Sequence, residues 1–137
     1  MATGEKIRHY RMLRGLYQSE LGNKIGLSEG AIRHYETGIR TPKQPLIEAI
    51  AEALDVSPLA LRDYGVESVR DFLGLLLQLE DDFGIAPSPD GTRLLIMPDA
   101  KNAPKMVQML RTWAEQRELL NSGEITAEEY CDWRSKF

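Results

Sequence analysis

The chain has 137 residues, with 17 Lys and Arg against 21 Asp and Glu, so its formal net charge is −4. One cysteine excludes an internal disulfide framework and any multi-cysteine metal site, and two histidines leave little for zinc. No run approaches roughly 18 apolar residues and the N-terminus lacks an apolar signal core, so we expect a cytoplasmic protein with no membrane span. Taken alone, an acidic total argues against nucleic acid as a partner, because phosphate contacts need Lys and Arg.

The charge is unevenly divided along the chain. Residues 1–65 carry nine basic and eight acidic residues, whereas residues 66–137 carry eight basic and thirteen acidic residues. The first part therefore has a charge of +1 and the second a charge of −5. This asymmetry indicates two regions with different tasks, a domain over residues 1–65 and a second region over residues 66–137.

Five short helices fit the first region. Apolar residues recur there at helical spacing, and Ser28 is a good N-cap for the third helix. Ser57-Pro58 reads as the N-cap and first position of the last helix. The predicted helices cover residues 7–13, 18–25, 28–37, 46–54 and 58–64. Every connection is only a few residues long, as expected for a compact helical bundle.

Residues 18–35 carry the strongest pattern in the chain. Two short helices that meet at a steep angle need a tiny side chain where they cross, and Gly22 lies at that position. The turn between them needs a residue that tolerates positive φ, which Gly26 supplies. Apolar side chains must face the shared core, and the residues at those positions are Leu21, Ile25, Leu27, Ile32 and Tyr35. Seven such requirements within 18 residues are hard to meet by chance.

The stretch YQSELGNKIGLSEGAIRHYETGIRTP, followed by LIEAIAEALDVSPLAL, resembles the helix-turn-helix domain of the XRE family, the Cro and lambda-repressor type. The resemblance covers about residues 4–64. It includes the Tyr-Glu-x-Gly motif that ends the third helix, formed by Tyr35, Glu36 and Gly38. Gly22 departs from the commoner alanine at the crossing, and Tyr17 stands where a small polar residue is frequent. The resemblance implies a mainly α fold, with a five-helix lambda-repressor-like domain that binds double-stranded DNA.

The resemblance also implies that the helix over residues 28–37 enters the major groove. If Ile32 and Tyr35 face inward, the outward positions near the start of this helix are those that reach base edges in this docking mode. The residues at these positions are Glu29, Gly30, Arg33 and His34. Arg33 can pair with guanine or hold a phosphate, and Glu29 can accept from a cytosine amine.

A second set of residues is expected to position the duplex through its phosphates. Gln18 opens the second helix, where side-chain and backbone donors commonly meet a phosphate. The other members lie on the third helix or near its two ends, and they are Ser28, Thr37, Arg40, Thr41 and Lys43. We expect Glu20 and Glu36 to form local salt bridges or caps and not to contact DNA.

A small α+β part is predicted for residues 66–137, made of a helix, a β-hairpin and two further helices. Ser68 can cap the first helix, which is apolar on more than one side and is therefore either core or shared with a second subunit. Pro89-Asp90-Gly91 is a typical turn sequence. In chain order, the predicted elements cover residues 69–83, 85–88, 92–97, 104–120 and 126–133.

No catalytic site, metal site or cofactor is expected. The glycines of the helix-turn-helix pattern lack the strand and the Lys-Ser/Thr step of a phosphate-binding loop. The consecutive acids Glu80, Asp81 and Asp82 point in different directions on a helix, and Cys131 has no histidine nearby in sequence. We therefore do not expect an enzyme.

The sequence as a whole predicts a dimeric repressor that reads a palindromic operator. Residues 66–137 would supply the dimer contact or a sensor surface, because the helix over residues 69–83 is too apolar for solvent. Two alternatives stay open for this part. It binds a protein partner, as in an antitoxin that also binds its own operator, or it binds a small effector in a pocket lined by Leu94, Met109 and Trp113.

Overall fold

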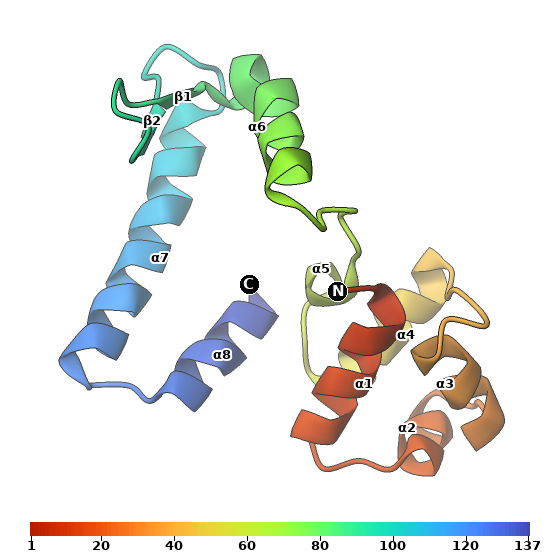
Figure 1. The fold of residues 1–137 in the computed structure, drawn as a ribbon. Coiled ribbons are helices and arrows are strands. Elements are labelled where there is room, and N and C mark those ends of the chain that lie inside the picture. The colour runs from red at the N-terminus through yellow and green to blue at the C-terminus, as the bar shows by residue number, and fades with distance from the viewer. The chain divides into compact units, whose positions relative to one another are not determined.

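The structure is a computed structural model that describes all residues, 1–137. It is mainly helical, with eight helices and one two-stranded antiparallel sheet, as predicted (Figure 1). Two compact units make up the chain: unit 1 holds residues 1–64 together with 131–137, and unit 2 holds residues 65–130. The last seven residues thus lie with unit 1 and not with the region that precedes them. None of the helices combines the length and the apolar character that a membrane span needs.

Five helices form the body of unit 1 and gather into one bundle in Figure 1. They are α1 (Thr3–Leu13), α2 (Gln18–Ile25), α3 (Glu29–Glu36), α4 (Gln44–Leu54) and α5 (Pro58–Leu61). The first helix starts earlier than its apolar spacing predicts, because the Glu5 carboxylate accepts a hydrogen bond of 2.8 Å from the backbone N–H of Ala2 and closes the first turn. Gly26 ends α2 in the left-handed conformation, with φ 73°.

One hydrophobic core holds unit 1 together. Each of the five helices contributes at least one fully buried apolar side chain, and the largest of these are Ile7, Leu21, Ile32, Ile50, Leu54 and Leu61. The spacing of these residues along each helix places them on one face, so burial of this face stabilises five helices that are each too short to be stable alone.

Gly22 lets α2 and α3 approach closely. A Cβ atom at this position would collide with the backbone carbonyl of Leu27, in the turn between the two helices. A backbone atom cannot move aside as the end of a side chain can, so this crossing is built for glycine. Glycine in place of the commoner alanine therefore fits the close approach of these two helices.

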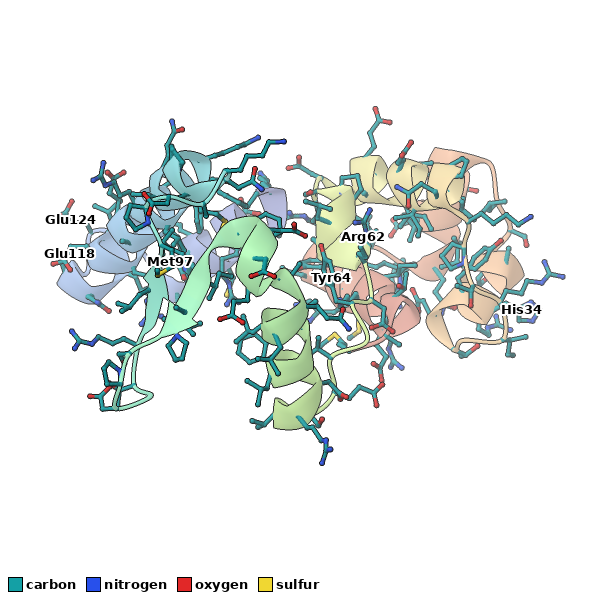
Figure 2. The ribbon with its side chains drawn as sticks, turned by 90° about the horizontal axis from the view of Figure 1, so that it is seen from above. His34, Arg62, Tyr64, Met97, Glu118 and Glu124 are labelled. Atoms are coloured by element: carbon teal, nitrogen blue, oxygen red, sulfur yellow. The ribbon has the colours of Figure 1, made fainter.

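Unit 1 is also tied together where α5 ends. Lys6 of α1 donates a hydrogen bond to the backbone carbonyl of Arg62. The Lys6 ammonium lies 6.0 Å from the centre of the Tyr64 ring, and the Arg62 guanidinium lies 5.9 Å from the same centre. Figure 2 labels Arg62 and Tyr64 at this end of the unit. These contacts hold the chain against α1 before it leaves unit 1.

Unit 2 has the predicted order of elements, namely α6 (Val69–Phe83), β1 (Ile85–Pro87), β2 (Leu94–Ile96), α7 (Ala103–Ser122) and the start of α8 (Ala127–Lys136). The capping box at the start of α6 is present, because Ser68 Oγ accepts from the Asp71 N–H at 3.0 Å and the Asp71 carboxylate accepts from the Ser68 N–H at 2.9 Å. The Asp71 carboxylate also accepts from the Ser68 hydroxyl at 2.7 Å and from the Glu67 N–H. The bonds that it accepts, first the one from the Ser68 hydroxyl, lower the pKa of Asp71.

The hairpin turn is closed by one carboxylate. Asp90 Oδ1 accepts from the Ser88 hydroxyl at 2.6 Å, from the Thr92 N–H at 3.1 Å and from the Thr92 hydroxyl at 2.8 Å. These bonds, the one from Ser88 first, lower the pKa of Asp90 to about 2. The two strands then pair antiparallel, with Ile85 opposite Ile96. The turn predicted from Pro89-Asp90-Gly91 therefore owes its form to its aspartate.

Candidate nucleic-acid interface

Helix α3 has one face in the core and one face in solvent. Ile32 is fully buried, whereas the side chains of Glu29 and Arg33 are each 57% exposed. The helix begins at a well-formed cap, where Ser28 Oγ accepts a hydrogen bond of 3.1 Å from the Ala31 N–H. A short helix anchored in this way presents its outer side chains at fixed positions.

The four predicted base-reading residues all lie on α3. Arg33 Nη2 is 3.5 Å from Glu29 Oε1, an exposed pair one helical turn apart and worth no more than about 0.5 kcal/mol. Arg33 can therefore leave Glu29 for another partner at little cost. Gly30 has open space around it, since a Cβ there would lie no closer than 3.9 Å to Ser28 Oγ. Figure 2 labels His34 at the outer edge of unit 1.

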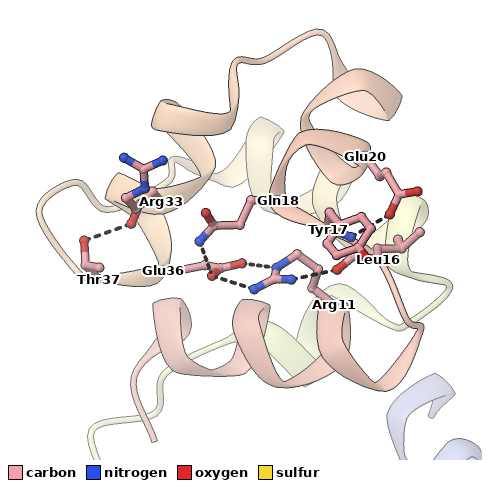
Figure 3. Close-up of polar contacts among 8 residues, drawn as sticks. All are labelled: Arg11, Leu16, Tyr17, Gln18, Glu20, Arg33, Glu36 and Thr37. Carbon is pink, nitrogen blue, oxygen red and sulfur yellow. Dashed lines mark hydrogen bonds and ion pairs between the residues drawn. The ribbon is translucent and has the colours of Figure 1, made fainter.

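A buried ion pair ties α3 to α1 behind this surface (Figure 3). The Arg11 guanidinium donates to both carboxylate oxygens of Glu36, with Nη2 to Oε2 at 3.1 Å, and its Nη1 donates to the Leu16 carbonyl at 2.6 Å. The two side chains are only 11% and 3% exposed. Glu36 forms an ion pair as expected, but its partner lies 25 residues away and the pair is not the local one that we predicted. Arg11 is not among the predicted site residues, although a charged residue four positions after the core residue Ile7 points to a paired role.

Gln18 belongs to the same network. Its amide Nε2 donates to Glu36 Oε2 at 2.9 Å, so one carboxylate holds both Arg11 and the first side chain of α2. One amide hydrogen and the amide oxygen of Gln18 are left over. Glu20 has the capping role expected of it, because its Oε2 accepts from the Tyr17 N–H at 2.6 Å.

The hydroxyls of Ser28 and Thr37 differ in what they can still donate. Ser28 Oγ accepts in its cap and keeps its own hydrogen, whereas Thr37 Oγ1 donates to the Arg33 carbonyl at 2.8 Å. A hydroxyl has one hydrogen, so Thr37 cannot donate to a phosphate while this bond stands. Ser28 is therefore the better phosphate donor of the two.

Three of the predicted phosphate-positioning residues come together after α3. Arg40, Thr41 and Lys43 are exposed and line one shallow hollow, whose other lining residues are Tyr35, Pro45 and Leu46. Two of the three are cations, so the hollow presents positive charge beside the end of α3. Gln18, at the start of α2, and Ser28 and Thr37, which cap the two ends of α3, do not line it.

The comparisons with known proteins concern this part of the chain. A helix-turn-helix family model matches residues 7–61. The P22 c2 repressor, solved in complex with a synthetic operator, is 33% identical over 44% of this chain and 92% of its own, with a TM-score of 0.43. Residues 7–61 form a helix-turn-helix domain of the XRE family.

Other solved structures match this XRE-family protein over the same share of its length. The restriction-modification controller protein C.AhdI from Aeromonas hydrophila is 32% identical over 44% of this chain and 91% of its own, with a TM-score of 0.43. SinR, solved in complex with DNA, is 32% identical over 44% of this chain and 98% of its own, with a TM-score of 0.42. No curated protein matches the chain. The helix-turn-helix family predicted for about residues 4–64 is confirmed over residues 7–61.

Unit 2 lies outside the residues that the family model matches. A shallow hollow on this unit runs beside α7 and is lined by Pro98, Ala103, Pro104, Val107, Gln108, Arg111, Thr112 and Glu115. The pocket residues expected for a small effector, Leu94, Met109 and Trp113, do not line it. The indole N–H of Trp113 instead donates to the Tyr130 hydroxyl at 2.7 Å.

Proposed function

We propose that this XRE-family regulator is a repressor that binds a palindromic operator as a dimer and reads each half-site with α3. The observation that carries the proposal is the division of α3 into a buried face under Ile32 and an exposed face that bears Arg33. Repression is the simplest outcome of such binding, because occupancy of the operator is enough to block the polymerase.

The exposed face of α3 is suited to the major groove. In this docking mode the outer side chains of the helix meet the base edges, and the four residues expected to do so are Glu29, Gly30, Arg33 and His34. Arg33 would give up its loose pair with Glu29 and donate two hydrogen bonds to a guanine. Gly30, with open space around it, would let the helix backbone come close to the bases.

The phosphates would be held around this helix. Gln18 would donate its second amide hydrogen from a position that Glu36 fixes, and Ser28 would donate its free hydroxyl hydrogen. Arg40, Thr41 and Lys43 would contact the backbone from their shared hollow. Thr37 would contribute by holding the end of α3 through its bond to the Arg33 carbonyl.

Two exchanges separate base reading from phosphate binding. Arg33→Ala should weaken operator binding by about 1–3 kcal/mol and relax the preference at one base position, because a bidentate contact to a base is lost. Lys43→Ala should weaken binding to all duplexes alike and flatten the dependence of log K on log salt by about one unit. Binding curves at several salt concentrations, on an operator selected from random duplex DNA and on a scrambled duplex, measure both effects. If neither exchange alters operator binding, α3 is not docked as proposed.

A dimer contact in unit 2 would supply the second half-site reader. One copy of unit 1 covers one half-site, and a palindrome needs two copies related by a two-fold axis. Helix α6 has no buried residue, and its exposed apolar side chains are Val69, Phe72, Leu73 and Leu77, at helical spacing. Such a stripe is unfavourable in water and supports contact with a second copy.

The dimer can be tested at its apolar stripe. Light scattering should give the mass of two chains at high micromolar concentration. Leu77→Lys should shift the chain toward the monomer, because it places a charge in the contact. Gln78→Lys, at the next and also exposed position of α6, is the matched control and should leave the mass unchanged. A monomer at high micromolar concentration in the unaltered chain would contradict the proposed dimer.

A further inference from the structure

The last seven residues return to unit 1 after the whole of unit 2. Helix α8 begins within unit 2 and ends within unit 1. Near its end, the carbonyl of Ser135 accepts a hydrogen bond of 2.7 Å from the backbone N–H of Ser57. The last four carbonyls of a helix have no partner within it, so this bond satisfies one of them. Ser135 is only 2% exposed, which marks a fitted contact and not a chance touch.

Charged side chains reinforce this contact. Arg14 Nη2 lies 3.0 Å from Asp132 Oδ1, and Lys136 Nζ lies 3.2 Å from Asp132 Oδ2 and 3.0 Å from Asp55 Oδ2. The four groups alternate in sign, from Arg14 through Asp132 and Lys136 to Asp55. The acid and the base of α8 stand four residues apart, so they face unit 1 together on one side of the helix.

The segment meets unit 1 at the corner between α4 and α5, residues 54–57. Asp55 has φ 53° and is the only non-glycine residue of the chain in the left-handed region. Arg14 supports this turn from α1, with Nε to the Leu54 carbonyl at 2.8 Å and Nη2 to the Asp55 carbonyl at 3.0 Å. Leu54 and Val56 on either side belong to the core. The corner is therefore an unfavourable backbone conformation held in place by its neighbours.

We propose that residues 131–137 form a strap that fixes the α4–α5 corner, and that Arg14, Asp55 and the Ser57 N–H form its docking surface. The surface fits a helix end that offers an acid, then a backbone carbonyl three residues later and a base four residues later, which this chain presents as Asp132, Ser135 and Lys136. None of these contacts involves α3, so the strap leaves the exposed face of that helix available. The strap does not depend on the proposed operator or on the proposed dimer.

The strap stays ionised over the neutral range. Hydrogen bonds from Arg14 and then from Lys136 lower the pKa of Asp132 below 3.8, and hydrogen bonds to Asp55 and then to Asp132 raise the pKa of Lys136 above 10.5. The contribution of Asp132 is therefore complete above its ordinary pKa and is lost as the pH falls through the lowered value. That of Lys136 is complete below its ordinary pKa and is lost as the pH rises through the raised value.

Amide hydrogen exchange in the full chain tests the strap at one atom. In Asp132→Asn/Lys136→Gln, the Ser57 amide should exchange several-fold faster than in the unaltered chain, because the bond to Ser135 opens more often. The Ile32 amide, in the core helix α3, should keep its rate. In 1 M salt the Ser57 amide of the unaltered chain should approach the rate of the variant, because exposed charges are screened.

Glu52→Gln is the matched control, because it removes an exposed acid of α4 that takes no part in the strap contacts. In this variant the Ser57 amide should exchange at the same rate as in the unaltered chain. Equal Ser57 rates in the double variant and the unaltered chain would overturn the strap. Equal acceleration of Ser57 and Ile32 would also overturn it, because the exchanges would then act through global unfolding and not at the corner. The strap would be overturned as well if Glu52→Gln accelerated exchange of the Ser57 amide as much as the double variant does.

Discussion

Glu36→Gln should lower the free energy of unfolding of unit 1 by about 3–5 kcal/mol. Glutamine keeps the shape of the side chain but removes the charge that faces Arg11. The Arg11 guanidinium would then stay buried, at 11% exposure of its side chain, without a counter-charge. Since domains are stable by about 5–15 kcal/mol in total, this loss is a large share of what holds the unit together.

Denaturant unfolding of the Glu36→Gln chain measures this effect. The matched control is Glu29→Gln on the same helix, where the carboxylate is 57% exposed and its pair with Arg33 is loose. That exchange should alter stability by no more than about 0.5 kcal/mol. Similar losses in the two variants would show that burial does not decide the strength of the pair. Glu36→Gln should also weaken DNA binding at a protein concentration where it is folded, because Gln18 loses its charged anchor.

Ile32→Ala should cost unit 1 about 2–5 kcal/mol, the usual range for removing a fully buried aliphatic side chain without collapse of the cavity. Ile32 is the side chain by which α3 enters the core. Its truncation removes contacts with the other helices of the bundle and leaves the exposed face of α3 chemically unchanged. Thermal and denaturant unfolding should both report the loss.

Arg33→Ala is the natural control for Ile32→Ala, because the two residues are neighbours on opposite faces of one helix. Arg33→Ala should leave the stability within about 0.5 kcal/mol, while it weakens operator binding. Ile32→Ala should behave in the reverse way once binding is corrected for the fraction of folded chain. If both exchanges weakened stability equally, the two-faced description of α3 would be wrong.

The parts of this molecule that could be predicted from the sequence are those set by local rules. Ser28 caps α3, Gly26 ends α2 and Asp71 closes the box with Ser68, and each of these follows from residues within four positions of one another. The crossing at Gly22 is also local, because the two helices it joins are consecutive. The resemblance to the family lies in this same short stretch, and membership of the family implies the arrangement of the five helices.

The parts that could not be predicted depend on pairs far apart in the sequence. Arg11 and Glu36 are 25 residues apart, and Arg14 and Asp132 are 118 residues apart. No periodic pattern connects such positions, so the spacing of one charged residue can indicate that it is paired but does not identify its partner. Unit 2 shows the same limit in another form. Its helices and strands can be predicted from caps and turn sequences. The sequence of α6 shows that the helix is apolar but does not identify the surface against which it packs.

The order of synthesis gives the strap a further meaning. Because Arg14 meets Asp132 across 118 residues, the α4–α5 corner gains its last supports only after all of unit 2 has left the ribosome. A nascent or prematurely ended chain that lacks Asp132 and Lys136 carries a complete α3 but an unsupported corner. Such a product is the easier target for proteases, which favour locally open structure. If the strap acts as proposed, the lifetime of the DNA-binding part depends on the synthesis of residues 131–137.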